Sequence, residues 1–253
     1  ANVVHHTARA LVEGLDADAL APYLKQAAER TGAKFTAALA ENGAEITVKG
    51  EAAHASTPEQ GNNALTALLT LLAALPLAES DGAARLRALA KLFPHGDTVG
   101  KALGVAMSDE VSGPLTISLN LLHVDGTSVS GVFDCRAPIC ATEENLQNVL
   151  SARTAEAGFK LEQQSTPAHH VPGDTPFVRT LLKCYEQYTG RKGECQSTGG
   201  GTYVHALKNG VAFGCSLPET DNRMHGADEF AVVDELLLAG QIFTQAILDL
   251  CGA

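Results

Sequence analysis

The stretch Ser197–Tyr203 reads STGGGTY, and a polar segment that reads MHGADE, Met224–Glu229, follows it. A short apolar run between them, Val211–Gly214, predicts a buried strand. Three successive glycines exceed what a turn requires. With Thr202 opening a helix, they offer free backbone N–H groups to an anion. The spacing matches neither a dinucleotide-binding fingerprint nor a Walker loop, so it does not indicate nucleotide binding.

His225 is the candidate metal ligand of this region. An imidazole binds zinc and similar divalent ions, and an acidic or carbonyl partner orients the ring. Asp228 and Glu229 follow His225 closely and could supply that partner. A single histidine does not make a metal site, and a surface histidine near a helix N-terminus is the alternative interpretation.

The composition of the 253-residue chain argues against several classes of function. It is 45% apolar and 19% charged, as is ordinary for a soluble globular protein. The net charge of −11, without a Lys/Arg cluster, argues against nucleic-acid binding. The longest apolar stretch, Leu68–Leu77, is shorter than the about 20 residues that span a bilayer, so we expect no membrane segment. Six cysteines without a C-x-x-C pair indicate reduced, mostly buried thiols and a cytoplasmic protein.

The first 168 residues predict an antiparallel sheet with helices on one face, an α+β arrangement. Asn42-Gly43 is a strong hairpin signal, because both residues accept positive φ. Asn62 or Asn63 is placed to cap the helix that follows. Strands are expected at 7–14, 34–40, 44–49, 115–122, 128–136 and 159–164, and helices at 18–30, 64–75, 83–93 and from Thr142 to Gly158. Residues 94–114 are glycine-rich and receive no assignment.

A domain boundary is predicted near residue 168. The segment Thr166–Gly173 holds two prolines and a glycine, which is typical of a linker. Beyond it, helices at 177–188 and 230–250 alternate with short strands, which predicts an α/β layer with a parallel sheet. Because so few strands could hardly bury a hydrophobic core by themselves, residues 169–253 are expected to form the end of a domain that begins elsewhere.

Two side chains of the first domain are candidates for substrate chemistry. His54 lies in a Ser/Thr/Pro loop after a strand and could donate to a developing oxyanion, although an ordinary loop histidine is the alternative. Arg136 ends an apolar strand at a position where alternation predicts burial, so it needs a partner. Asp134, on the same face, or a substrate carboxylate could be that partner.

Taken in order, several segments resemble the dipeptidase (PepV-like) branch of the co-catalytic di-zinc peptidases. That family also includes carboxypeptidase G, aminoacylase and succinyl-diaminopimelate desuccinylase. The segments that carry the resemblance are GEAAHASTPE at Gly50–Glu59, GNNA at Gly61–Ala64, FDCR at Phe133–Arg136, GGGTY at Gly199–Tyr203, VAFG at Val211–Gly214 and HGADEF at His225–Phe230. The resemblance implies a lid at 1–168, which binds substrate and mimics a dimer, and the C-terminal part of an α/β catalytic domain at 169–253.

The resemblance also implies roles for single residues. His225 would bind one metal ion, and His54 would polarise the scissile carbonyl and stabilise the tetrahedral intermediate. The implied site for the terminal carboxylate of the substrate comprises Asn120, Arg136, Gly199, Gly200, Gly201 and Thr202. The reaction would be dipeptide hydrolysis by a bridging water that two cations acidify; zinc is expected, with manganese or cobalt as alternatives.

One departure from the family pattern is large. The family places a His-x-Asp segment, a Glu-Glu pair and a further Asp before the lid, and none of them precedes the lid here. We therefore expect a fragment that binds no di-metal centre and hydrolyses no dipeptide without its missing N-terminal catalytic segment. The alternatives are a non-catalytic peptide-binding or oligomerisation module and an amidohydrolase for N-acyl amino acids. A monomer is preferred, because such a lid mimics a dimer within one chain.

Overall fold

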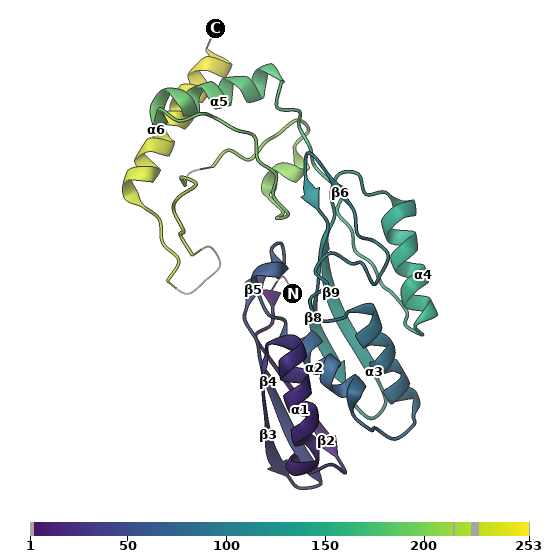
Figure 1. Ribbon diagram of the computed structural model, residues 1–253. Helices are drawn as coiled ribbons and strands as arrows, with labels where there is room; N and C mark the ends of the chain where they lie inside the picture. The colour runs from purple at the N-terminus through teal and green to yellow at the C-terminus, as the bar shows by residue number, and fades with distance from the viewer. Residues whose placement is uncertain (1–2, 215, 224–227, 253) are drawn as a thin grey trace. The chain divides into compact units, whose positions relative to one another are not determined.

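The computed structural model describes residues 3–214, 216–223 and 228–252 (Figure 1). The chain divides into two compact units, Ala1–Pro167 and Ala168–Ala253. Within the described residues, no helix combines the length and the apolar character needed to cross a membrane.

The first unit begins with the predicted β-α-β-β pattern. Helix α1 (Ala17–Thr31) lies in sequence between β2 (Thr7–Glu13) and a hairpin formed by β3 (Lys34–Ala40) and β4 (Gly43–Lys49). The three strands form an antiparallel sheet of order β2-β4-β3, and α1 packs against β3. Alternate residues of β4 are fully buried, which gives the sheet an inner face. The predicted strands and helix are therefore confirmed.

Helix α2 (Ala64–Ala74) lies at the centre of the core of this unit and packs against α1, α3 (Asp81–Leu92) and strands of both larger sheets (Figure 1). Its leucines are buried on nearly every side. Asn63 caps the helix: its Oδ1 accepts hydrogen bonds from the N–H groups of Leu65 at 2.9 Å and Thr66 at 3.4 Å. The predicted cap and both predicted helices are confirmed.

A second antiparallel pair completes the main framework of the first unit. Strands β8 (Thr116–Val124) and β9 (Val129–Arg136) form the predicted hairpin. Leu119 lies opposite Phe133 and Leu121 lies opposite Val132, so the register shifts at Asn120. Asn120 therefore occupies a β-bulge, a device that redirects a side chain.

Short elements connect these layers. Two small antiparallel pairs and three helical segments make up the rest of the unit: β1 (Val3–Val4) with β5 (Ala53–His54), β6 (Ser108–Asp109) with β7 (Gly113–Pro114), η1 (Pro58–Gln60), the π-helical turn η2 (Glu143–Gln147) and α4 (Asn148–Glu156). Thr142 caps η2 through a reciprocal capping box with Asn145. The helix predicted after Thr142 is confirmed.

The strand predicted at 159–164 is wrong. The segment is irregular and pairs with no strand among the described residues. Phe159 instead packs on the main core, and the Arg85 guanidinium lies 5.9 Å from the centre of its ring. Apolar side chains of the segment thus contact the core, although its backbone forms no strand-to-strand hydrogen bonds within the described residues.

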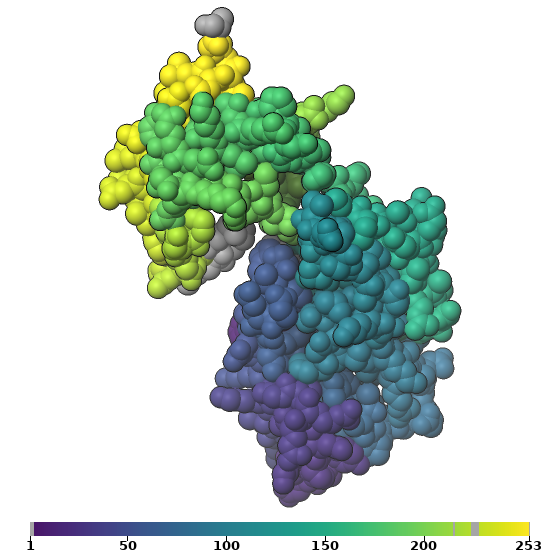
Figure 2. Space-filling model, turned by 45° about the horizontal axis from the view of Figure 1, so that its top comes forward, coloured from purple at the N-terminus to yellow at the C-terminus, as the bar shows by residue number. Residues whose placement is uncertain are grey.

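The second unit contains two long helices, α5 (Pro176–Thr189) and α6 (Val233–Cys251), and the one-turn helix η3 (Tyr203–Ala206). Pro176 occupies the first turn of α5, and Gly190 at φ 67° ends it. The two long helices share a small core of four buried residues, Leu181, Cys184, Ile242 and Ala246. Much of α6, yellow in Figure 2, lies at the surface.

The strand predicted at Val211–Gly214 is wrong, and the described residues of this unit form no parallel sheet. Val211 and Phe213 are partly buried against the α5–α6 core, whereas Ala212 and Gly214 are exposed. A parallel strand needs neighbouring strands, and the described part of this unit supplies none. The broader fold class, mixed α/β with antiparallel sheets and packed helices, is confirmed.

The five described cysteines are free thiols. Cys184 is buried and Cys135 is partly buried, but Cys140, Cys195 and Cys251 are exposed. The prediction of mostly buried thiols is wrong, because the exposed three lie in loops and at the end of α6 rather than on core-facing strands.

Candidate functional site

His54 ends the short strand β5, where it lies opposite Val3 of β1. Its side chain is partly buried. The carbonyl oxygen of His54 accepts a hydrogen bond from the N–H of Thr57 at 3.0 Å, which closes a tight turn after the strand. Ala55, the next residue, is fully buried. The His54 loop is therefore anchored on both sides of the histidine.

The imidazole of His54 contacts its own loop through one nitrogen. Nδ1 lies 2.6 Å from Ser56 Oγ and 3.2 Å from the backbone nitrogen of Ser56, whose N–H donates to it. Both contacts are local, two residues apart in sequence, so the turn itself orients the ring.

The His54 loop lies against the β8–β9 pair. The hydroxyl of Thr116 donates to the carbonyl oxygen of Ala55 at 3.5 Å. Thr116 lies opposite Arg136 in the strand register, and Ser118 lies opposite Asp134. Residues opposite one another point to the same face of a sheet, so this face carries the arginine and also meets the His54 loop.

Arg136 forms a two-point ion pair with Asp134. Nε donates to Oδ1 at 2.5 Å, and Nη2 donates to Oδ2 at 2.9 Å. Both side chains are largely shielded, with exposed fractions of 26% for Arg136 and 20% for Asp134. The sequence left Asp134 and a substrate carboxylate open as the partner of Arg136, and the structure has Asp134 in that place.

Asn120 lies on the same face, at the bulge, and is fully buried. The hydroxyl of Ser118 donates to its Oδ1 at 2.8 Å. In this arrangement the acceptor end of the amide lies toward Ser118. The first unit thus has Asn120 and Arg136 on one face of the β8–β9 pair, and the loop that follows His54 contacts the same face through Thr116.

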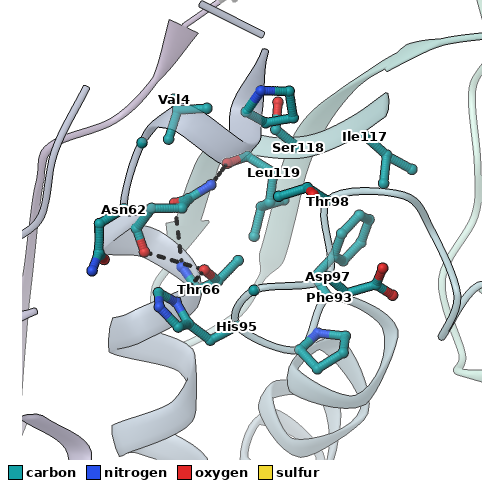
Figure 3. A pocket seen from close by; sticks show the side chains of 15 residues that line it. Val4, Asn62, Thr66, Phe93, His95, Asp97, Thr98, Ile117, Ser118 and Leu119 are labelled. Atoms are coloured by element: carbon teal, nitrogen blue, oxygen red, sulfur yellow. Dashed lines mark hydrogen bonds between the residues drawn. The ribbon is translucent and has the colours of Figure 1, made fainter. Parts of the chain in front are cut away.

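A cavity of about 80 Å³ lies beside the loop that follows His54 (Figure 3). It is far smaller than the about 300 Å³ or more of ordinary ligand pockets. His95 borders it: Nδ1 lies 2.9 Å from Thr66 Oγ1, and Nε2 lies 3.0 Å from the carbonyl oxygen of Thr31. Burial lowers the pKa of His95, against a smaller opposing effect of the Thr31 bond. The cavity is therefore a small void between the segment that runs from η1 into α2, the segment after α3, and β8.

His95-Gly96-Asp97 has the His-x-Asp spacing of a metal-binding segment, but both side chains already form hydrogen bonds within the first unit. The Asp97 carboxylate accepts N–H bonds from Val99, Lys101 and Ala102 at 2.8–3.3 Å. Among the residues that the structure describes, no three His, Cys, Asp or Glu side chains form a group that could hold a metal ion. The described residues thus do not fit a resident metal centre.

Two backbone N–H groups in and beside the triple glycine of the second unit donate hydrogen bonds to neighbouring side chains. The N–H of Gly200 donates to Thr198 Oγ1 at 3.1 Å, and the N–H of Thr202 donates to His205 Nδ1 at 3.2 Å. The expectation of free N–H groups is therefore wrong for Gly200 and Thr202. The helix that Thr202 opens, η3, is a single turn and adds little dipole.

The predicted metal ligand His225 lies outside the described residues. Its neighbour Asp228 is described: it adopts a left-handed backbone conformation at φ 57° and lies 3.8 Å from the guanidinium of Arg223. Both side chains of this pair are exposed, so the contact contributes little to stability.

Sequence reasoning missed two serines of the site, Ser56 and Ser118. Each stands two residues from a predicted site residue, Ser56 from His54 and Ser118 from Asn120, and bonds to it. For Ser118 the available signal was strand alternation, which puts residues i and i+2 on one face. For Ser56 it was the local bonding habit of serine in turns.

Comparison with known proteins identifies the family. Residues 42–155 match the M20 model described as the peptidase dimerisation domain. The chain is 33% identical over 253 residues to the "Putative dipeptidase YtjP" of Bacillus subtilis (strain 168), in an alignment that covers 98% of this chain and 53% of the relative. It is 31% identical over 251 residues to the "Beta-Ala-Xaa dipeptidase" of Lactobacillus delbrueckii subsp. lactis, with the same coverage.

The chain spans about half the length of the curated relatives it matches. The resemblance drawn from the His54 loop, the Arg136 strand and the triple glycine is confirmed by these matches. The matches thus support the M20 dipeptidase family for this chain, with a peptidase dimerisation domain at residues 42–155.

Proposed function

We propose that this chain is the lid and part of the catalytic domain of a metal-dependent dipeptidase. The observation that carries the proposal is that one face of the β8–β9 pair holds Asn120 and Arg136 and is also contacted by the His54 loop. The names of the relatives, both dipeptidases, support the substrate class. In this proposal residues 1–168 are the lid, and residues 169–253 are the C-terminal part of the catalytic domain.

Arg136 and Asn120 recognise the terminal carboxylate of the dipeptide. A guanidinium presents planar donors that match a carboxylate, and the ion pair with Asp134 fixes the plane of the guanidinium before substrate arrives. The amide of Asn120 is held by Ser118 with its acceptor end engaged, which directs its donor end away from that contact. The backbone of Gly199, Gly200, Gly201 and Thr202 is a second carboxylate-binding element, in which Gly200 and Thr202 exchange their internal partners for substrate.

His54 donates a hydrogen bond to the carbonyl oxygen of the scissile peptide bond. The bond strengthens as negative charge develops on that oxygen in the transition state. Removal of such a donor typically lowers kcat by about 10²–10³-fold. The His54→Ala substitution in the complete enzyme removes the donor and tests the role: we expect a loss of kcat of this size with little change in KM. An unchanged kcat would count against it.

Metal dependence is part of the proposal, with zinc as the expected ion and manganese or cobalt as alternatives. His225 is proposed as one ligand. The other ligands are proposed to come from outside the 253 residues, since the chain spans about half the length of its relatives. We therefore propose that this polypeptide alone does not hydrolyse dipeptides.

A second function is favoured by one observation, the match of residues 42–155 to a dimerisation domain. Under this proposal the chain is a non-catalytic module that binds peptides or associates with another copy. It predicts peptide binding that survives EDTA and is lost in Arg136→Ala, measured by calorimetry. Light scattering would show the association, and a monomer at high concentration would exclude it.

A further inference from the structure

We propose that Ser56 is a positioning residue that holds the His54 imidazole in the tautomer with its proton on Nε2. The proposal deepens the function proposed above, because it concerns the group that donates to the substrate carbonyl. It is carried by the two contacts that Ser56 makes with a single ring nitrogen, Nδ1.

The backbone contact settles which nitrogen is bare. An amide N–H can only donate, so the bond from the Ser56 nitrogen, at 3.2 Å, requires an unprotonated acceptor at Nδ1. A neutral imidazole carries one proton, which must then be on Nε2. The Ser56 hydroxyl, 2.6 Å from the same nitrogen, can donate to it as well. Two donors directed at Nδ1 disfavour the tautomer that would place a proton there.

The frame around the loop holds Ser56 in this position. The N–H of Thr57 donates to the carbonyl of His54, and the carbonyl of Ala55 accepts from Thr116. Ala55 and Pro58 are buried on either side of Ser56. The contact between Ser56 and His54 Nδ1 is therefore part of a turn that the surrounding hydrogen bonds hold in place.

The tautomer decides what His54 can do. With the proton on Nε2, the ring is a hydrogen-bond donor at the atom farthest from its own loop. The other tautomer would present a lone pair at Nε2, which repels a carbonyl oxygen that is gaining negative charge. Ser56 thus acts through His54 and needs no contact with substrate.

Nitrogen NMR on the full chain tests the tautomer directly. The histidines are labelled with ¹⁵N, and two-bond ¹⁵N–¹H correlations are recorded near pH 8. The signals of His54 are assigned by their loss in His54→Gln. We expect a protonated Nε2 and a bare Nδ1 in the wild-type protein. A proton on Nδ1 would overturn the proposal without any need for a variant.

Ser56→Ala removes the hydroxyl and keeps the backbone donor, and Ser56→Thr restores a hydroxyl. In Ser56→Ala we expect the two nitrogen shifts of His54 to move toward each other, as in a mixture of tautomers, and in Ser56→Thr to return toward wild type. The backbone amide spectrum reports whether each variant is folded. Unchanged nitrogen shifts in a folded Ser56→Ala protein would contradict the role of the hydroxyl.

Turnover separates this proposal from the function on which it rests. In the complete enzyme we expect Ser56→Ala to lower kcat about tenfold, the effect of one lost hydrogen bond of about 1.4 kcal/mol, with KM little changed. If His54→Ala keeps full kcat while His54 shows the Nε2 proton, the catalytic role fails and the tautomer assignment stands. If His54→Ala is inactive while the proton is on Nδ1, only the positioning proposal fails.

Discussion

Asp134 accepts two hydrogen bonds from Arg136, from Nε at 2.5 Å and from Nη2 at 2.9 Å. The pair fixes the plane of the guanidinium at the face where substrate is proposed to bind. A lysine at position 136 keeps the positive charge but loses the planar pair of donors that a guanidinium presents. We therefore expect Arg136→Lys to raise KM for dipeptides about tenfold, the equivalent of one charge-assisted hydrogen bond, with a smaller effect on kcat.

Steady-state kinetics of the complete enzyme measure this effect. Arg9→Lys is the matched control, because Arg9 is exposed on β2 and forms only a long contact of 4.0 Å with Glu45. Its KM should equal that of the wild type. Equal KM values for Arg136→Lys and Arg9→Lys would mean that Arg136 does not bind the substrate carboxylate.

Asn63 is expected to stabilise the first unit more than an ordinary helix cap does. It caps α2 with its Oδ1, and its Nδ2 also donates to the carbonyl of Leu119 in β8 at 2.8 Å. Asn63→Ala removes both functions and should lower the free energy of unfolding by about 2 kcal/mol. Ser80→Ala removes only the cap of α3 and should cost about 1 kcal/mol. Urea unfolding measures both, and equal losses would contradict the added role of Asn63.

His95 is expected to make stability depend on pH. Burial lowers its pKa in the folded protein, so the unfolded chain, with a pKa of about 6.5, takes up a proton more readily. The contribution is fully present above about pH 6.5 and is lost as the pH falls below it toward the folded pKa. Asp97 also lines the cavity and is a nearby charged group, with its carboxylate bound by backbone N–H groups.

Urea unfolding at pH 7.5 and pH 5.5 tests this expectation, with His95→Gln as the comparison. The wild type should lose more stability between the two pH values than the variant does, because the other histidines are common to both. An identical pH dependence in the two proteins would exclude His95 as the source.

Local signals in the sequence were enough to predict most of the first unit. The β3–β4 hairpin forms where Asn42-Gly43 predicted it, but its loop is Glu41-Asn42, and neither Asn42 nor Gly43 adopts the positive φ on which the prediction rested. Asn63 starts α2 with its own side chain, and in the second unit Pro176 and Gly190 mark the two ends of α5. At these helix ends the chemistry of one residue determines the backbone, so the pattern and the structure agree.

Features that depend on distant partners could not be predicted in this way. The segments 159–164 and 211–214 carry strand-like patterns, but a strand forms only beside another strand, and both segments pack apolar side chains on helices or on the core. Within the site, the spacing of Asp134 and Arg136 already suggested their pairing. The contact of Ser118 with Asn120 depends on the bulge in β8, and no residue pattern in the sequence predicts that bulge.

The central claim, a metal-dependent dipeptidase of which this chain supplies only part, is tested most directly by one assay. Hydrolysis of dipeptides is measured for the purified 253-residue chain and for the complete gene product, with zinc and with EDTA. We expect turnover by the complete product that EDTA abolishes and zinc restores, and no turnover by the chain alone. Zinc-dependent hydrolysis by the chain alone, or EDTA-resistant hydrolysis by the complete product, would contradict the account.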